Sequence, residues 1–280
     1  MSKPFFSVII PTFNRRHVLS RAIDSVLNQS FKDFELIIVD DGSSDETQTY
    51  LDTIKDLQVF KTIKPEEPSG VSVARNVGVA NANANWICFL DSDDEWMTQK
   101  LEKQYRWIKE NPGARLVYGQ ERWVRNSKRV NKMNKHTKGG GDLFERSIEL
   151  CLIGCSTVCL EKSLINELGG FREDFPVCED YDLWLKVTSL YKVGFIEDEL
   201  IIKYGGHKDQ LSRKFKAMDY YRIKSMNWIL KNRTLTPVRR ELILTSMKTK
   251  CEILLKGYEK HNNLDNYAEV LYILENSVGV

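Results

Sequence analysis

Trp86-Ile87-Cys88-Phe89-Leu90 runs directly into Asp91-Ser92-Asp93-Asp94, so an apolar, strand-like stretch ends in three carboxylates and a hydroxyl. Carboxylates crowded at the C-terminal end of a strand repel one another unless a cation or a ligand offsets their charge. In open α/β sheets that end is also where ligands bind. The alternative is a solvated acidic turn that caps the next helix. The segments around this stretch favour the ligand site.

The segments before residue 86 alternate between strand-like and helix-like patterns. Apolar runs rich in β-branched residues predict strands, and apolar residues at a helical period predict the helices between them. Such a series is typical of a parallel sheet covered on both faces. Right-handed crossovers would bring the loops 11–14, 40–44 and 91–95 and the turn before Gly70 to one edge of the sheet. The expected strands are 5–11, 34–39, 57–63 and 86–90, and the expected helix before the last of them is 70–82.

The pattern becomes mixed after residue 112. Residues 125–141 are basic, poor in apolar side chains and end in glycines, which predicts a mobile loop. From Arg213 onward amphipathic helices are expected, one of them beginning at Pro237. The remaining expected elements are strands 114–124, 156–160 and 193–204 and helices 97–111, 162–168 and 180–191.

These patterns predict an α/β fold with a mostly parallel sheet, helices on both of its faces and a helical C-terminal region. We expect one domain over residues 1–212, with two halves that meet near residue 112, and a helical region over residues 213–280. Two loop residues are expected to start helices, because Asn14 can cap the first one and Ser43 or Ser44 the second.

Composition limits the classes of function. The 280 residues carry a net charge of +2, which argues against a protein that binds nucleic acid through bulk charge. Residues 1–4 lack the apolar region of a signal peptide, and the chain has no apolar run of about 20 residues that could span a membrane. Together with six cysteines that we expect to be reduced thiols, this predicts a cytoplasmic protein. Cys151, Cys155 and Cys159 recur every four residues, but Gly154 and the β-branched run after Cys155 argue against a metal or disulfide site there.

Four short motifs resemble the family 2 glycosyltransferases. They are Ser7-Val8-Ile9-Ile10-Pro11-Thr12-Phe13-Asn14-Arg15, Val39-Asp40-Asp41-Gly42-Ser43, Phe89-Leu90-Asp91-Ser92-Asp93-Asp94 and Glu179-Asp180-Tyr181-Asp182-Leu183-Trp184-Leu185. The resemblance covers about residues 5–207. It implies a fold of the GT-A type, in which a nucleotide-binding α/β half is fused to an acceptor-binding half.

The first two motifs would form the nucleotide site. The resemblance implies that Pro11, Thr12 and Asn14 border the nucleotide and that Asp41 accepts a hydrogen bond from the uracil imide. The alternative role for Asp41 is in the N-terminal turn of a helix, a role that suits Asp40 better. The family pattern also implies that Arg75 helps to hold the nucleotide. An arginine on a packed helix can instead form a structural ion pair with a strand-end aspartate, and the two roles are compatible.

The third motif resembles the DxD motif of the family. It implies that Mn²⁺ or Mg²⁺ bridges Asp93 and the donor diphosphate, because hard oxygen ligands suit such an ion. Asp91 and Ser92 would contact the nucleotide sugar, and Asp94 is expected to be a helix cap. His207 resembles a late histidine that some relatives bring to the metal or the diphosphate. The alternative is a solvated loop histidine.

The fourth motif implies the catalytic base. Asp180 would take the proton of the acceptor hydroxyl, opposite the leaving group, in one displacement with inversion. The alternative is that Glu179 and Asp180 only stabilise the start of a helix. The Gln-x-x-Arg-Trp signature of polymer-forming relatives is missing, which favours one transfer per encounter.

The predicted function is therefore metal-dependent transfer from a nucleotide-diphosphate sugar, with a UDP-sugar favoured, to a glycan or lipid-linked saccharide of a bacterial-type surface polymer. The alternatives are a sugar nucleotidyltransferase and a non-catalytic module that binds nucleotide sugars. Residues 213–280 carry 13 Lys and Arg against 7 Asp and Glu. This basic region could contact the inner face of a membrane, pair two subunits as a homodimer, or be a solvated helix face.

Overall fold

The computed structural model describes residues 3–54, 60–65, 67–131, 133, 136–206 and 217–277. The chain forms two compact units. The first consists of Met1–Gly141, Ile153–Pro176 and Lys192–His207, and the second of Asp142–Leu152, Val177–Tyr191 and Lys208–Val280. The domain boundary expected near residue 212 lies outside the described residues.

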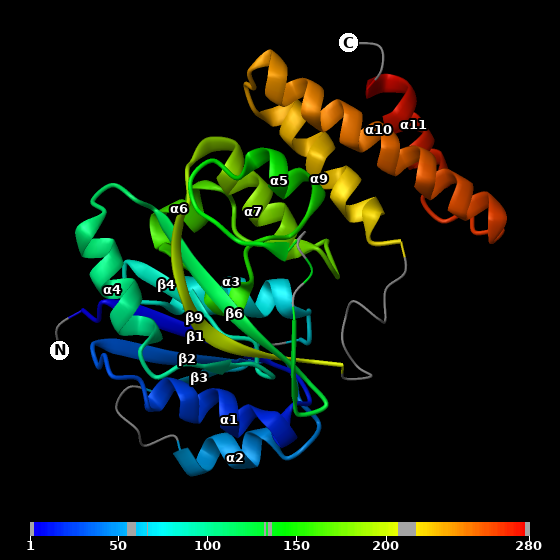
Figure 1. The fold of residues 1–280 in the computed structure, drawn as a ribbon. Helices are drawn as coiled ribbons and strands as arrows, with labels where there is room; N and C mark the ends of the chain where they lie inside the picture. Colours follow the sequence, from blue (N-terminus) through cyan, green and yellow to red (C-terminus); the bar gives the residue numbers. More distant parts are fainter. Residues whose placement is uncertain are drawn as a thin grey trace. The chain divides into compact units, whose positions relative to one another are not determined.

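Nine strands in the described part of the first unit form one sheet, in the order β3-β2-β1-β4-β8-β6-β9-β5, with β7 paired to β6 (Figure 1). The strands β1 to β4 are mutually parallel, as the sequence predicts, whereas β8 runs antiparallel to β4 and β6. The strands are β1 Phe6–Thr12, β2 Phe34–Asp40, β3 Phe60–Ile63, β4 Trp86–Phe89, β5 Glu95–Trp96, β6 Leu116–Arg125, β7 Lys128–Val130, β8 Cys159–Glu161 and β9 Gly194–Gly205.

Helices cover both faces of this sheet. Val8 and Ile10 of β1 belong to the same buried cluster as Leu19 of α1. Ile9, on the opposite face of the strand, packs so closely on Gly78 of α3 that no Cβ would fit there. Burial on both faces explains why Val8, Ile9 and Ile10 of β1 are consecutive apolar residues. The helices of this unit are α1 Arg16–Leu27, α2 Thr47–Ile54, α3 Val71–Asn81, α4 Lys100–Glu110 and α6 Lys162–Glu167, with a 3₁₀ helix, η2, at Cys155–Thr157.

The described part of the second unit is helical and has its own core. Tyr181 and Leu185 pack with Ile223 and Met226 and with Met247 in one buried cluster. Helix α10 begins at Pro237 as predicted, and the hydroxyl of Thr236 accepts a hydrogen bond from the Arg239 backbone N–H. The helices are α5 Phe144–Glu149, α7 Glu179–Leu190, α9 Asp219–Asn232, α10 Pro237–Lys260 and α11 Tyr267–Ser277. Within the described residues, no helix is both long enough and apolar enough to cross a membrane.

Several local expectations are wrong. The segment expected to be a mobile loop contains β7, which pairs with β6 and is held by an ion pair between Arg129 and Glu199 of β9 at 2.7 Å. β7 follows β6 through the two-residue turn Asn126-Ser127, in which both residues have positive φ, so a hairpin orders this part of the segment. The short elements β5 and α5, of two and six residues, also escape prediction.

Neither predicted helix cap is present. Asn14 has a left-handed backbone conformation with φ of 52° and does not cap α1, whose first residue, Arg16, donates its N–H to Oδ2 of Asp45 at 3.0 Å. At α2 the carboxylate of Asp45, not Ser43 or Ser44, accepts a hydrogen bond from the Thr47 N–H at 3.0 Å. The carboxylate of Asp45, two residues before Thr47, therefore replaces the expected serine hydroxyls as the acceptor of this helical N–H.

Candidate active site

The loop after β1 is tied to the loop after β2. The Asn14 side-chain oxygen accepts hydrogen bonds from the backbone N–H of Ser44 at 2.8 Å and of Asp45 at 3.3 Å. The Asn14 N–H in turn donates to the Ser43 hydroxyl at 2.8 Å. Asn14 therefore shapes the edge of the sheet by joining two loops.

Buried polar groups lie between these loops. Pro11 and Thr12 are buried, and among the described residues no group hydrogen-bonds to the Thr12 hydroxyl or to Oδ2 of Asp40. The other oxygen of Asp40 accepts from the Ser43 N–H at 3.0 Å, in agreement with the structural role expected for it. Phe13, which the sequence reasoning left without a role, is 50% exposed at this edge.

Asp41 holds the loop that precedes α3. Its two carboxylate oxygens accept hydrogen bonds from the backbone N–H of Ser69 at 3.0 Å and of Gly70 at 2.8 Å. Gly70 has φ of 91°, a conformation in which a side chain would be strained. Asp41 thus links the end of β2 to the start of the helix that carries Arg75.

Arg75 and Asp91 form the ion pair that the sequence allowed, with 2.8 Å between Nη2 and Oδ1. Burial by itself would favour the neutral acid of Asp91. The charges of Arg75 and Lys203 and hydrogen bonds from Arg75 and Ser156 outweigh it, so the pKa of Asp91 lies below its ordinary value. The guanidinium of Arg75 also lies 5.1 Å from the centre of the Phe171 ring. Asp91 is therefore held as a charged carboxylate.

Asp94 is not a helix cap. It is only 2% exposed, its Oδ2 accepts a hydrogen bond from the Ser156 hydroxyl at 2.7 Å, and its Oδ1 accepts from the Tyr204 N–H at 3.2 Å. The chain continues into β5 instead of a helix, so no free helical N–H groups lie near this carboxylate. Burial and then the charges of Asp93 and Asp91 raise the pKa of Asp94 well above its ordinary value, although Lys203 opposes them.

Asp93 is the carboxylate of this turn that remains uncommitted. Within the described part of the chain it forms no ion pair and takes no hydrogen bond from another residue's side chain or backbone. Its backbone carbonyl accepts from Nη2 of Arg21 at 2.6 Å. Burial and then the charge of Asp91 raise the pKa of the Asp93 carboxyl, against the opposing charges of Arg15 and Lys203. Ser92 beside it is buried.

These carboxylates suit a divalent ion that a ligand helps to hold. Among the described residues no three His, Cys, Asp or Glu side chains gather closely enough to bind a metal without other ligands. A half-buried carboxylate without a partner among the described residues, next to a paired one, fits an ion whose other ligands are phosphate and water oxygens. His207, the second predicted ligand, lies outside the described residues.

Sequence reasoning missed three residues that act on this turn, namely Lys203, Arg21 and Ser156. Lys203 lies on β9, and its charge acts on all three carboxylates of the turn. No signal in the sequence marks it, because its place beside the turn follows from the order of strands in the sheet.

The predicted base lies in the second unit. Asp180 is partly exposed at the start of α7, where its Oδ1 accepts from the Tyr181 N–H at 2.7 Å and its Oδ2 accepts from the thiol of Cys151 at 3.3 Å. All six cysteines of the chain are free thiols. Asp182, two residues further on, is buried with Lys186, with 2.7 Å between Oδ2 and Nζ. The start of α7 therefore offers one accessible carboxylate and one paired carboxylate.

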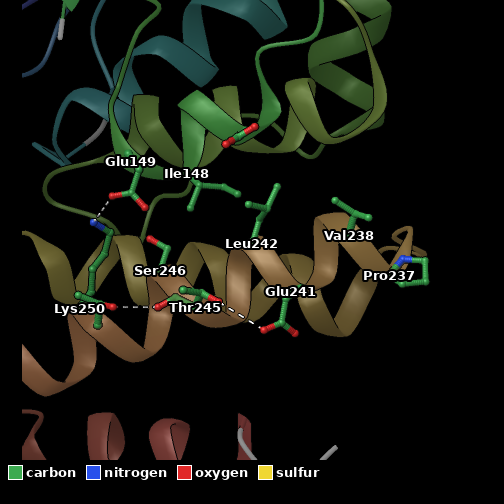
Figure 2. A pocket seen from close by; sticks show the side chains of 11 residues that line it. Ile148, Glu149, Pro237, Val238, Glu241, Leu242, Thr245, Ser246 and Lys250 are labelled. Atoms are coloured by element: carbon green, nitrogen blue, oxygen red, sulfur yellow. Dashed lines mark hydrogen bonds and ion pairs between the residues drawn. The ribbon is translucent and has the colours of Figure 1, made fainter.

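Figure 2 shows a groove of about 710 Å³ in the second unit, between α5 and α10. Its apolar part includes Ile148 and Leu242, and the carboxylate of Glu149 on its wall is paired with Lys250 at 3.1 Å. None of the predicted site residues lines it. We place the candidate site at the sheet edge because the uncommitted carboxylate is there.

The model of glycosyl transferase family 2 matches residues 7–166 of the chain. The UDP-Glc:alpha-D-GlcNAc-diphosphoundecaprenol beta-1,3-glucosyltransferase WfgD of Escherichia coli is 33% identical over 214 residues, which cover 76% of this chain and 81% of WfgD. This similarity favours the predicted glycosyltransferase over the nucleotidyltransferase and the non-catalytic module.

Solved structures agree on the fold. TarS 1-349 of S. aureus, in complex with UDP, aligns with a TM-score of 0.77 at 19% identity, over 98% of this chain and 81% of TarS. The mannosyltransferase PcManGT from Pyrobaculum calidifontis, in complex with GDP-Man and Mn²⁺, aligns with a TM-score of 0.64 at 15% identity, over 99% of this chain and 81% of PcManGT. The chain belongs to glycosyl transferase family 2 and is a glycosyltransferase with a fold of the GT-A type.

Proposed function

We propose that this glycosyltransferase moves a sugar from a UDP-sugar to a hydroxyl of a lipid-linked saccharide, in one inverting, divalent-metal-dependent step per encounter. The observation that carries the proposal is the uncommitted carboxylate of Asp93, beside the ion pair of Arg75 and Asp91 and within the field of Lys203. The UDP bound to TarS supports the donor, and the diphosphoundecaprenol-linked substrate in the name of WfgD supports the acceptor.

The nucleotide would lie along the ends of β1 and β2. Each oxygen of Asp41 accepts one backbone N–H, and a carboxylate has about four lone-pair sites, so Asp41 can still accept the imide N–H of uracil. Phe13 offers an exposed ring on which the base can stack. Pro11, Thr12 and Asn14 would border the base and the ribose.

The diphosphate would lie over the acidic turn. Asp93 would hold Mn²⁺ or Mg²⁺, with His207 as a further ligand, and the bound ion would supply positive charge for the departing nucleoside diphosphate. Arg75 would contact the nucleotide diphosphate while it holds Asp91 in its charged form. Asp91 and Ser92 would contact the nucleotide sugar.

Asp180 would take the proton of the acceptor hydroxyl. Its carboxylate is partly exposed, and each of its oxygens accepts one hydrogen bond. Each oxygen therefore keeps a lone pair that can accept the proton of the acceptor hydroxyl. A base on the side opposite the leaving group gives inversion at the anomeric carbon in a single displacement.

Ligand-dependent thermal stability tests the donor site. UDP should raise the melting temperature of the wild type only when Mn²⁺ or Mg²⁺ is present, because a ligand that binds only the folded state stabilises it. Asp93→Ala should lose this ion-dependent shift, while Asp265→Ala, which removes an exposed carboxylate of the second unit, should keep it. An equal shift without any divalent ion would contradict the metal assignment.

The basic C-terminal helices are the proposed contact with either a membrane or a second subunit, on an enzyme that we place at the cytoplasmic face. Exposed cations on α10 include Lys248, Lys256 and Lys260. Co-sedimentation with anionic vesicles that weakens at high salt would support the membrane contact. A dimer in light scattering without vesicle binding would support the pairing of subunits.

A further inference from the structure

Ser156 is joined to the acidic turn by two hydrogen bonds and to the strand after it by a third. Its hydroxyl accepts from the Asp91 N–H at 3.1 Å and donates to Oδ2 of Asp94 at 2.7 Å, and its carbonyl accepts from Nε1 of Trp96 at 2.8 Å. Ser156 lies in η2 and is 2% exposed. One buried residue therefore bonds to both ends of the turn and to the strand that follows it.

The hydroxyl acts as both an acceptor and a donor in this network. A serine hydroxyl has one proton and two lone pairs. A lone pair accepts the backbone N–H of Asp91, which leaves the proton for the carboxylates of the turn, with Oδ2 of Asp94 at 2.7 Å. Asp94 is itself held from the other side by the Tyr204 N–H of β9, and its own N–H donates to the Asp91 carbonyl at 3.0 Å. The ends of the turn are thus bonded to η2, to β9 and to each other.

A second set of contacts keeps η2 in place beneath the turn. The Trp96 ring lies 3.8 Å from Nζ of the fully buried Lys100, which donates to Oε1 of Gln104 at 2.7 Å. The Gln104 amide donates to the carbonyl of Thr157, the residue after Ser156, at 2.9 Å. These contacts form a closed circuit from Ser156 through α4 and back to η2, so the serine has little freedom to shift.

Among the described residues, the circuit leaves one carboxylate of the turn without a bonded partner. Asp91 is paired with Arg75, Asp94 is bonded to Ser156 and Tyr204, and the Asp93 backbone is held by Arg21. The Asp93 carboxylate is the remaining charge, and the rigid turn sets its direction. A metal ligand whose backbone is held in this way needs less reorganisation when the ion binds.

We propose that Ser156 is a positioning residue of the transfer reaction, which orients the Asp93 carboxylate toward the divalent ion of the donor complex by fixing the turn at Asp91 and Asp94. This inference rests on the proposed function. If Ser156 has this role, removing its hydroxyl should weaken ion binding more than removing an equally buried hydroxyl that does not bond to the turn.

Thr157 supplies that matched control. It is fully buried in the same 3₁₀ helix, and its hydroxyl donates only within that helix, to the Gly154 carbonyl at 2.8 Å. Thr157→Val removes this hydroxyl with little change of shape and keeps the backbone carbonyl that Gln104 uses. Ser156→Ala removes the hydroxyl that bonds to the turn.

The test is the affinity of the full chain for Mn²⁺ in the presence of UDP, measured by calorimetry well below each variant's melting temperature. Ser156→Ala should weaken Mn²⁺ binding about tenfold or more, the usual effect of losing a group that orients a metal ligand, while Thr157→Val should stay close to the wild type. The Mn²⁺ concentration for half-maximal turnover should shift by the same factor.

Trp96→Phe is the second variant, in case Ser156→Ala does not fold. It removes the N–H that holds the Ser156 carbonyl, together with part of the indole, and keeps a smaller aromatic ring against Lys100. It should weaken Mn²⁺ binding in the same direction by a smaller factor. If the wild type binds UDP without any divalent ion, the proposed function fails. If the wild type requires the ion and Ser156→Ala matches Thr157→Val, only the positioning role is overturned.

Discussion

Two acidic clusters in this enzyme are similar in sequence but are stabilised by different kinds of contact. At Asp91–Asp94 each held carboxylate is bonded to a residue from a distant element, for example Asp94 to Ser156 and Tyr204. At the start of α7 the contacts are mostly local, since Asp180 accepts from the next N–H and Asp182 pairs with Lys186 one turn along. Adjacent carboxylates therefore do not specify their own environment. A helix start holds them locally, whereas a strand end depends on the rest of the sheet.

Asp180→Asn should give the largest effect. The amide cannot take a proton from the acceptor, so turnover should fall by about a thousandfold, within the usual range for a general base. UDP binding should be unchanged, because the change leaves the residues of the sheet edge intact. Radiolabelled sugar transfer together with calorimetry with UDP measures both. Turnover within tenfold of the wild type would remove Asp180 from the role of base.

Asp182→Ala should lower stability without affecting catalysis, although Asp182 lies on the same turn of α7 as Asp180. It leaves the buried ammonium of Lys186 without its carboxylate, which should lower the free energy of unfolding by about 3 kcal/mol. Turnover per folded molecule should stay close to the wild type. Urea denaturation followed by circular dichroism measures the loss, and Asp180→Asn serves as the control that affects catalysis instead.

Acid pH should reduce the stabilisation that comes from another carboxylate with partners far along the chain. Glu121 of β6 is buried with Lys138, with 2.6 Å between Oε1 and Nζ. Burial alone would raise the pKa of Glu121, but the charges of Lys138 and Lys203 and hydrogen bonds from Lys138 and Trp123 lower it from 4.5 to about 2. The folded state therefore binds this proton more weakly than the unfolded state does, and the stabilisation is complete above about pH 4.5 and lost as pH falls toward 2.

By linkage, the difference between the pKa of Glu121 in the folded and the unfolded state contributes at most about 3 kcal/mol to the free energy of unfolding. Glu121→Gln should flatten the pH dependence of the unfolding free energy between pH 4.5 and 2. Denaturation in urea at several pH values measures it. An unchanged slope in the variant would show that other groups account for the acid sensitivity.

Asp45→Ala should give the smallest effect. This carboxylate is exposed and bonds to the N–H groups of Thr47 and Arg16, so its removal should cost about 1 kcal/mol, as for other helix caps. Thermal unfolding measures the change. A loss as large as that of Asp182→Ala would mean that this exposed carboxylate stabilises the fold as much as a buried ion pair does.

Patterns within short segments were enough to predict much of the fold. The parallel strands β1 to β4, the helices between them and the helix that begins at Pro237 follow from apolar periodicity and helix-start preferences, which act over a few residues. The motifs also place Asn14, Asp41, Arg75 and Asp93 at ends of strands or helices that share one edge of a parallel sheet.

Tertiary structure alone determined the partners of the buried charges. Asp94 meets Ser156 and Tyr204 across 62 and 110 residues of sequence, and Lys203 reaches the acidic turn because of the order in which the strands pair. Arg129 of β7 likewise meets Glu199 of β9 across 70 residues of sequence. The local pattern decides which apolar groups are buried, and these groups need no particular partner. A buried charge, in contrast, is stable only beside an opposite charge or a hydrogen-bonding group. The folded sheet supplies that partner from far along the chain.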